Sequence, residues 1–249
     1  MPLKEKVRAA VDEFDQAIAY HEAWKPAAYD TSLHGRMGTS FATNTFWVIR
    51  QALRREMLMS LIRLWDEGQK ERAISLPNIA NILGDCRIMN VLAAKCEAQW
   101  GTQPVSGPVG ETEDVRAAVQ RSEAAFGQER SKKLRQQATC AIALIRRYEK
   151  GGAKHETLKY LHQLRNQHLA HRQRKPDSLG SASSDSTDEA IEAFYQDMAK
   201  VIHRLCAVVE NSDYQPTDSA ENHSKFAALF WAGVHGERTE GHPAYKVSR

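Results

Sequence analysis

Residues 40–65 read SFATNTFWVIRQALRREMLMSLIRLW and form the longest helical pattern in the chain. Apolar residues recur in it every three or four positions, the spacing that gathers side chains on one face of a helix. On that face lie Phe46, Ile49, Leu53, Met57, Leu61 and Leu64, widened by Trp47, Leu58, Ile62 and Trp65. A stripe of this width predicts a helix at the centre of a bundle.

Helical patterns also flank this central segment, and no stretch shows the alternation typical of a half-buried strand. We predict further helices over residues 3–24, 75–84, 85–100, about 153–175, 186–209 and 226–234, and helical pattern over 113–148, either continuous or broken near Gly127. Proline, glycine or serine is frequent in three stretches that we predict as loops, residues 25–39, 101–112 and 176–187. The predicted fold class is therefore all-α, with one domain over residues 1–210 and a C-terminal extension over 211–249.

Composition limits the classes of protein to which the chain can belong. With 42% hydrophobic and 26% charged residues, it has the make-up of a globular protein. No apolar run is long enough for a bilayer, and the start, MPLKEK, lacks a signal-peptide core, so we expect no membrane partner. The four cysteines lack metal-site spacing and predict buried thiols in a cytoplasmic protein: Cys86, Cys96, Cys140 and Cys206.

The net charge of +3 is too small for a general polyanion binder, although basic residues cluster at 130–135, 146–147 and 172–175. Such clusters either follow a phosphate backbone or form solvated helix faces. The solvated face is the preferred interpretation for the first two.

The stretch LRNQHLAHR, residues 164–172, is the part of the chain that indicates chemistry. It lies late in the helix predicted between Gly151-Gly152 and Pro176. Arg165 projects into the apolar stripe of this helix, where a cation without a partner is costly to bury. Either the side chain reaches the edge of the stripe and solvent, or the stripe opens there onto a functional cleft or a second subunit.

Arg165 and His171 suit work on a phosphate. Arginine binds two phosphate oxygens and keeps its charge, and histidine transfers protons near neutral pH. Six residues separate the two by about 120° around a helix and ~9 Å along it, so one straight helix does not easily aim both at one phosphate. A bent helix end achieves this, and two copies meeting across a two-fold axis achieve it more simply, which predicts a homodimer.

The pattern of an arginine, a polar residue and a histidine six positions after the arginine, late in an all-helical chain, resembles the active-site motif of HEPN domains. These are bundles of four to five helices, and many are metal-independent ribonucleases of toxin and antiphage systems. The full stretch 164–172, together with EMLMSLIRLWD at 56–66 and SLPNI at 75–79, resembles the abortive-infection U-type branch. The resemblance covers roughly residues 10–210.

This resemblance implies an endoribonuclease in which Arg165 and His171 are the catalytic pair and Asn166 is an orienting amide. It implies RNA as the substrate, neither a cofactor nor a metal, and the possibility of an antitoxin or nucleotidyltransferase partner. His168 and Arg172 are candidate substrate-binding residues, with a surface position as the alternative for His168. The histidines of the stretch lack a common face and a carboxylate or thiolate partner, which disfavours a zinc site.

Three hypotheses of function remain open at this point. The first is a metal-independent endoribonuclease of toxin or antiphage type. The second is a HEPN domain without catalysis that binds RNA or serves as a dimerising partner module. The third is an unrelated helical interaction protein, in which Arg165 and His171 are structural. Cleavage of mixed RNA separates the first from the others, and the salt dependence of RNA binding separates the second from the third.

Overall fold

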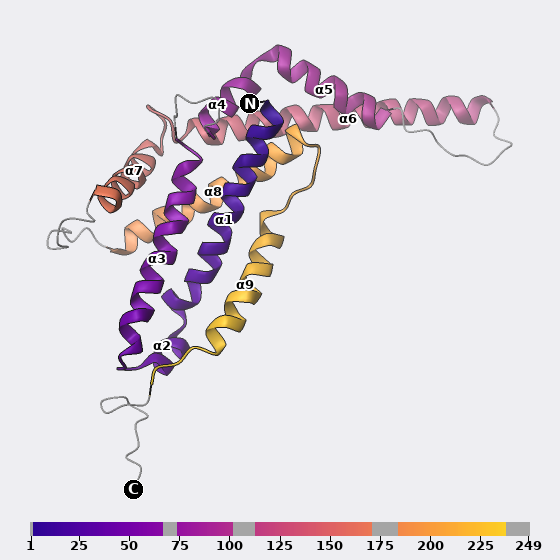
Figure 1. Ribbon diagram of the computed structural model, residues 1–249. Helices are drawn as coiled ribbons and strands as arrows, with labels where there is room; N and C mark the ends of the chain where they lie inside the picture. Colours follow the sequence, from indigo (N-terminus) through magenta and orange to yellow (C-terminus); the bar gives the residue numbers. More distant parts are fainter. Residues whose placement is uncertain (1, 67–73, 102–112, 171–183, 238–249) are drawn as a thin grey trace, which may run out of the picture. The chain divides into compact units, whose positions relative to one another are not determined.

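The computed structural model describes residues 2–66, 74–101, 113–170 and 184–237, and every regular element in these segments is an α-helix (Figure 1). The helices are α1 (Leu3–Tyr29), α2 (Thr31–Met37), α3 (Ala42–Arg63), α4 (Leu76–Gly84), α5 (Cys86–Gly101), α6 (Glu113–Arg146), α7 (His155–Ala170), α8 (Ser184–Val209) and α9 (Pro216–Ala232). The predicted all-α class is confirmed. None of these helices combines the length and the apolar character that crossing a membrane requires.

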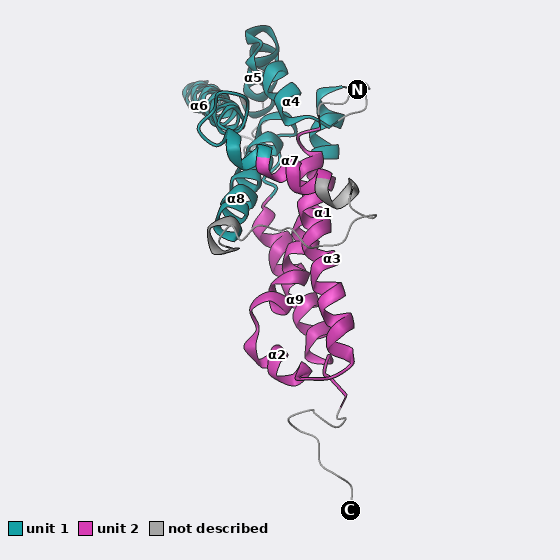
Figure 2. Cartoon of the chain, turned by 90° about the vertical axis from the view of Figure 1, so that its left-hand side faces the viewer, with its two compact units in different colours: residues 1–10, 67–159, 180–214 teal, residues 11–66, 160–179, 215–249 magenta. Residues whose placement is uncertain are grey.

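The chain divides into two compact units, and the division falls within α1 and within α7 (Figure 2). Unit 1 comprises Met1–Ala10, Glu67–Lys159 and Gly180–Tyr214, and unit 2 comprises Val11–Asp66, Tyr160–Leu179 and Gln215–Arg249. The predicted single domain over residues 1–210 stays a prediction.

Unit 2 is built around the last two thirds of α1, with α3 and α9 beside it (Figure 1). α3 runs antiparallel to α1, since Arg63 at its end donates to Glu13 in the first half of α1 at 3.0 Å, whereas Phe46 near its start shares a buried cluster with Ala27 near the end of α1. α9 runs in the same direction as α1, because the Trp231 indole donates to the Ala23 carbonyl oxygen at 2.8 Å and Ser219 donates to Asp15 at 3.1 Å. α3 also contacts α9, through the rings of Phe46 and Trp231, so the central place predicted for residues 40–65 stays a prediction.

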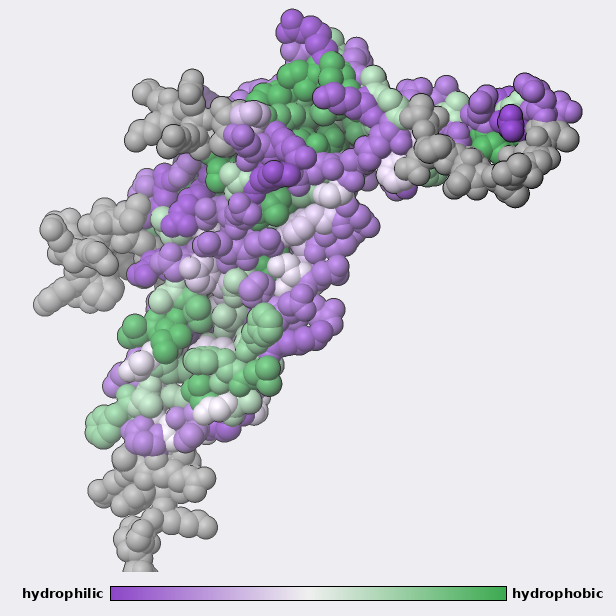
Figure 3. Space-filling view, turned by 45° about the vertical axis from the view of Figure 1, so that its right-hand side comes forward, coloured by the Kyte–Doolittle hydropathy of each residue, from purple (hydrophilic) through white to green (hydrophobic). Residues whose placement is uncertain are grey.

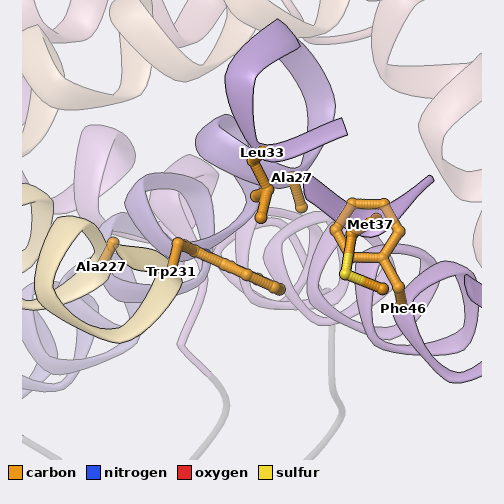
Figure 4. Packing of buried hydrophobic residues seen from close by; sticks show 6 residues of the cluster. All are labelled: Ala27, Leu33, Met37, Phe46, Ala227 and Trp231. Atoms are coloured by element: carbon orange, nitrogen blue, oxygen red, sulfur yellow. The ribbon is translucent and has the colours of Figure 1, made fainter. Parts of the chain in front are cut away.

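One hydrophobic cluster joins the ends of these helices and α2 (Figure 4). Its buried members are Ala27, Leu33, Met37, Phe46, Ala227 and Trp231. The Phe46 and Trp231 rings meet edge to face, with centroids 5.7 Å apart. The cluster therefore combines side chains from the first fifth of the sequence with side chains from its last tenth.

The loop predicted over residues 25–39 is wrong, because most of this stretch is helical. α1 continues through Pro26 to Tyr29, and α2 follows after one residue. Asp30 makes the short connection possible, since its carboxylate accepts the backbone N–H groups of Ser32 and Leu33 at 2.8 and 3.2 Å and so caps α2.

Two other expectations need correction. The predicted inward face of α3 is right for Met57, Leu58, Leu61 and Ile62, but Trp47 and Ile49 are exposed. Of the four predicted buried thiols, Cys96 and Cys206 are buried, Cys140 is half-buried and Cys86 is exposed.

Unit 1 consists mainly of α4, α5, α6 and α8. α6 packs against α5, α4 and α8, and α4 also contacts α5. The Ser75 hydroxyl accepts the Asn78 N–H at 3.4 Å and caps α4, so the predicted start and the predicted end at Gly84 are both confirmed. The apolar face predicted for α8 is also confirmed, because every one of its residues is buried: Ile191, Phe194, Met198, Val201, Ile202 and Leu205.

Candidate functional site

A glycine turn separates α7, the helix that carries the motif, from α6. Gly151 has a φ of 87°, a backbone conformation that residues other than glycine rarely adopt. A Cβ atom on Gly152 would collide with the backbone carbonyl oxygens of Arg146 and Arg147. The two glycines therefore end one helix and begin the next, as the sequence predicts.

A buried ionic network holds this turn against α8 within unit 1. The Tyr148 hydroxyl donates to Asp197 Oδ2 at 2.9 Å, and Lys154 Nζ donates to the same oxygen at 2.8 Å. Tyr148 is fully buried and also meets the Phe194 ring edge to face at 4.9 Å. Because Lys154 directly precedes α7, the network fixes where the motif helix starts.

The network keeps its carboxylate charged. Burial raises the pKa of Asp197, but the hydrogen bonds from Lys154 and Tyr148 outweigh that effect, and the pKa lies below its ordinary value. For Tyr148, burial and the neighbouring carboxylate both raise the pKa well above the ordinary value of the phenol. Throughout the physiological pH range, Tyr148 is therefore a neutral phenol that donates the hydrogen bond, and Asp197 is a charged carboxylate that accepts it.

Along α7, the predicted apolar stripe is confirmed at Leu158 and Leu161, which are buried. Leu164 is half-buried, and the side chain of Leu169 lies outside the described residues. Arg165 follows this stripe, and 23% of its side chain is exposed.

Arg165 pairs with Asp66 within unit 2: guanidinium Nη1 donates to carboxylate Oδ1. Asp66 lies just beyond the end of α3, where the Trp65 N–H donates to the Ile62 carbonyl oxygen at 2.8 Å and tightens the last turn. The Asp66 side chain is 43% exposed. Arg165 is thus neither buried alone nor simply extended into water, because a partly exposed carboxylate fixes it.

Asp66 was not predicted as part of the site. It is 99 residues from Arg165 in sequence, and periodicity along a helix says nothing about a contact of that range. The available signal was indirect, since Asp66 ends the stretch 56–66 that carries part of the HEPN resemblance.

The structure describes the remaining motif residues only in part. Asn166 follows Arg165 on α7 and is exposed. The backbone of His168 belongs to α7, but its side chain lies outside the described residues. His171 and Arg172 lie entirely outside them. The structure therefore brings Arg165 and Asp66 together, and the place of His171 stays a prediction.

In the described segments, no three residues of the types His, Cys, Asp and Glu gather as a possible metal site. What the described site offers is a preformed guanidinium at a partly exposed position. Such a group binds and neutralises an anionic oxygen.

Comparisons with known proteins support one family. The family model described as AbiU2, of the HEPN group, matches residues 2–228 of the 249. No curated protein matches the chain, and no solved structure does. The match includes the Arg165–Asp66 pair and the whole stretch 164–172. The chain belongs to the AbiU2 family of HEPN domains.

Proposed function

We propose that the chain is a metal-independent endoribonuclease of the abortive-infection type, in which Arg165 and His171 from two copies act on one phosphate. The AbiU2 family match supports a HEPN function of the abortive-infection kind. The observation that carries the proposal further is the ion pair between Arg165 and Asp66, because it holds a partly exposed guanidinium in one orientation.

The ion pair leaves Arg165 able to bind a phosphate. A guanidinium has several N–H donors, and Asp66 takes one of them, at Nη1. Among the described residues no other partner of this guanidinium is recorded, and its remaining N–H groups suit the non-bridging oxygens of a phosphodiester, to which arginine donates in parallel. Asp66 is therefore a positioning residue. Because it already restricts the Arg165 side chain in the free protein, less conformational entropy is lost when substrate binds.

His171 supplies proton transfer in this proposal. A neutral imidazole takes the proton of the ribose 2′-hydroxyl, the 2′-oxygen attacks phosphorus, and the bond to the 5′-oxygen breaks. A protonated imidazole from the second copy gives its proton to the leaving 5′-oxygen. The products are a 2′,3′-cyclic phosphate and a free 5′-hydroxyl, and every step balances without a metal.

Other residues and partners complete the proposal. Asn166 orients the phosphate from its exposed position beside Arg165, and His168 and Arg172 contact neighbouring nucleotides. The active species is a homodimer with the α7 helices at its two-fold axis. An antitoxin or nucleotidyltransferase partner stays a prediction.

The Arg165–Asp66 pair also supports one alternative. The carboxylate neutralises the arginine, and an ion pair that only stabilised the fold would have the same geometry. The alternative is a HEPN module that dimerises or binds RNA without cleaving it.

The test is cleavage of mixed RNA by purified protein in excess EDTA. Arg165→Ala and His171→Ala are expected to lower the rate by a factor of about a hundred or more, because each removes a transition-state contact. Asp66→Ala is expected to lower it roughly 5–30-fold, as the restored freedom of one arginine side chain predicts. A substrate with a single 2′-deoxy position should resist cleavage there.

Glu13→Gln is the matched control, because it removes a similar ion pair, with Arg63, from the same end of α3. It should leave the rate unchanged. Cleavage at the deoxy position, or a requirement for added magnesium, would overturn the mechanism. Wild-type protein that binds RNA without cutting it would favour the alternative.

A further inference from the structure

The second half of α9 is apolar on all sides. It reads FAALFWA over residues 226–232. Ala227 and Trp231 are buried in the hydrophobic cluster of unit 2, whereas Phe226, Leu229 and Phe230 are exposed on the other side. A helix that is apolar all round is normally covered all round. One side of α9 therefore lacks a cover in the described chain.

The start of α3 extends this exposed surface. Phe41, Trp47 and Val48 are exposed there, and the two helices are joined by a continuous series of ring contacts. Trp47 meets Phe46 at 5.9 Å, Phe46 meets Trp231 at 5.7 Å, and Trp231 meets Phe230 at 4.9 Å. Figure 3 shows apolar side chains, in green, gathered over this part of unit 2.

We call this surface the apolar end of unit 2, and define it as Phe41, Trp47, Val48, Ile49, Phe226, Leu229 and Phe230. Five of these seven side chains are 59–80% exposed, and Trp47 and Ile49 are 46% and 36% exposed. Aromatic side chains bury roughly 150–250 Å² each and the three aliphatic ones somewhat less, so the exposed parts of all seven together leave on the order of 800 Å² of apolar surface. That exceeds the largest patch of an ordinary monomer and equals about one side of a standard interface.

The charges around this surface decide what kind of partner it suits. Residues 29–53 and 215–237, the two segments that contain these side chains, carry three basic side chains (Arg36, Arg50 and Lys225) and four acidic ones (Asp30, Asp218, Glu221 and Glu237), and Arg54 and Arg55 follow on α3. RNA or an acidic lipid surface calls for an excess of basic groups, which is absent from these two segments. A rim with both signs and almost no net charge faces a copy of itself without repulsion.

We propose that the apolar end of unit 2 is a two-fold interface with a second copy of this chain. α3 separates it from the ion pair of Arg165 and Asp66: Val48 and the end of α3 at Arg63 are about 20–25 Å apart along the helix. The interface is therefore distinct from a dimer formed through α7. Where the two axes are perpendicular, two different two-fold interfaces on one chain assemble four copies.

The mass of the purified protein in solution tests this inference by multi-angle light scattering at micromolar concentrations. Leu229→Glu places a charge in the middle of the exposed side of α9 and is expected to halve the mass of the assembly. Val91→Glu is the matched control, because Val91 is exposed on α5 in unit 1, and it should leave the mass unchanged. A monomeric wild type of 28.0 kDa, or equal masses for both variants, would overturn the inference.

A cross-linking experiment guards against a change in fold. Leu229→Cys should give a covalent pair of chains with a short bis-maleimide, in clear excess over wild type, whose own exposed thiol is Cys86. No excess over wild type would count against the interface even if Leu229→Glu lowers the mass.

RNA cleavage keeps the two proposals apart. Leu229→Glu should cut RNA at the wild-type rate per chain, whereas Arg165→Ala should lose cleavage at unchanged mass. If no variant cuts RNA, the proposed function fails, and the mass measurements still decide the interface.

Discussion

Tyr148→Phe is the most informative change in the buried network at the start of α7. It removes the hydroxyl that donates to Asp197 at 2.9 Å but keeps the ring and its contact with Phe194. Asp197 retains the Lys154 ammonium at 2.8 Å and Lys200 at 3.5 Å. The variant therefore isolates one hydrogen bond to a buried, charged acceptor.

The size of the effect follows from these contacts. A hydrogen bond to a charged group contributes about 1.5–3 kcal/mol. Since Asp197 keeps Lys154, we expect a loss near the lower limit, about 1.5–2 kcal/mol. In a chain of this length that corresponds to a fall in Tm of roughly 3–8 °C. Tyr160→Phe is the control, because Tyr160 is an exposed tyrosine on α7, and it should leave Tm unchanged.

The pH dependence of the stability that Tyr148→Phe loses relative to wild type gives a second check. The pKa of Asp197 is lowered in the folded protein from an ordinary value of 3.8, so the stabilisation is complete above that pH and is lost as pH falls further. The pKa of Tyr148 is raised from 10.0, so the unfolded chain ionises first at high pH and stability falls above that value. The difference in unfolding free energy between wild type and Tyr148→Phe should therefore be constant between pH 3.8 and pH 10.0. It should become smaller below the first value and above the second.

Urea unfolding followed by circular dichroism, from acidic to alkaline pH, measures these differences. A difference below about 0.5 kcal/mol near neutral pH, the size of an ordinary surface change, would refute the reasoning. So would a difference that stays constant below the ordinary pKa of the carboxyl group.

Two further substitutions test local geometry by thermal unfolding. Gly152→Ala should destabilise the protein by about 1–3 kcal/mol, because the new Cβ atom collides with backbone carbonyl oxygens. Gly35→Ala on α2 is the control: its Cβ atom has no neighbour within 4 Å, so this change should be neutral or stabilising. Ser75→Ala removes the cap of α4 and should cost about 1 kcal/mol, with Ser75→Gly costing less; equal effects would argue against the cap.

The sequence predicts the helices well where local pattern determines them. The predicted ends of α4 follow from Ser75 and Gly84, and the buried face of α8 follows from its regular apolar spacing. Residues 25–39 differ from the prediction, because Pro26 and the glycines indicate a loop whereas burial of Leu33 and Met37 in the cluster of unit 2 keeps α2 helical. Tertiary packing overrides local propensity there.

The candidate site was predictable only as a stretch of chain. Composition and spacing identified Arg165 as an unusual cation in an apolar stripe, and the structure shows that it has a partner. The identity of that partner, Asp66, depends on how α3 and α7 approach one another, which no local pattern contains. The exposure of Trp47 has the same origin, since an apolar spacing shows which side chains share a face but not how far a neighbour covers it.

The cluster that joins Phe46 to Trp231 has a consequence during synthesis of the protein. A ribosome adds about 5–20 residues per second, so the chain waits on the order of 10–40 seconds between making these two residues. Throughout that interval Phe46, Met37 and Leu33 lack the α9 side chains that cover them in the finished protein. A nascent chain is therefore most exposed to aggregation, and most in need of a chaperone, before α9 leaves the ribosome. Chains released early should be removed by proteases rather than accumulate in folded form.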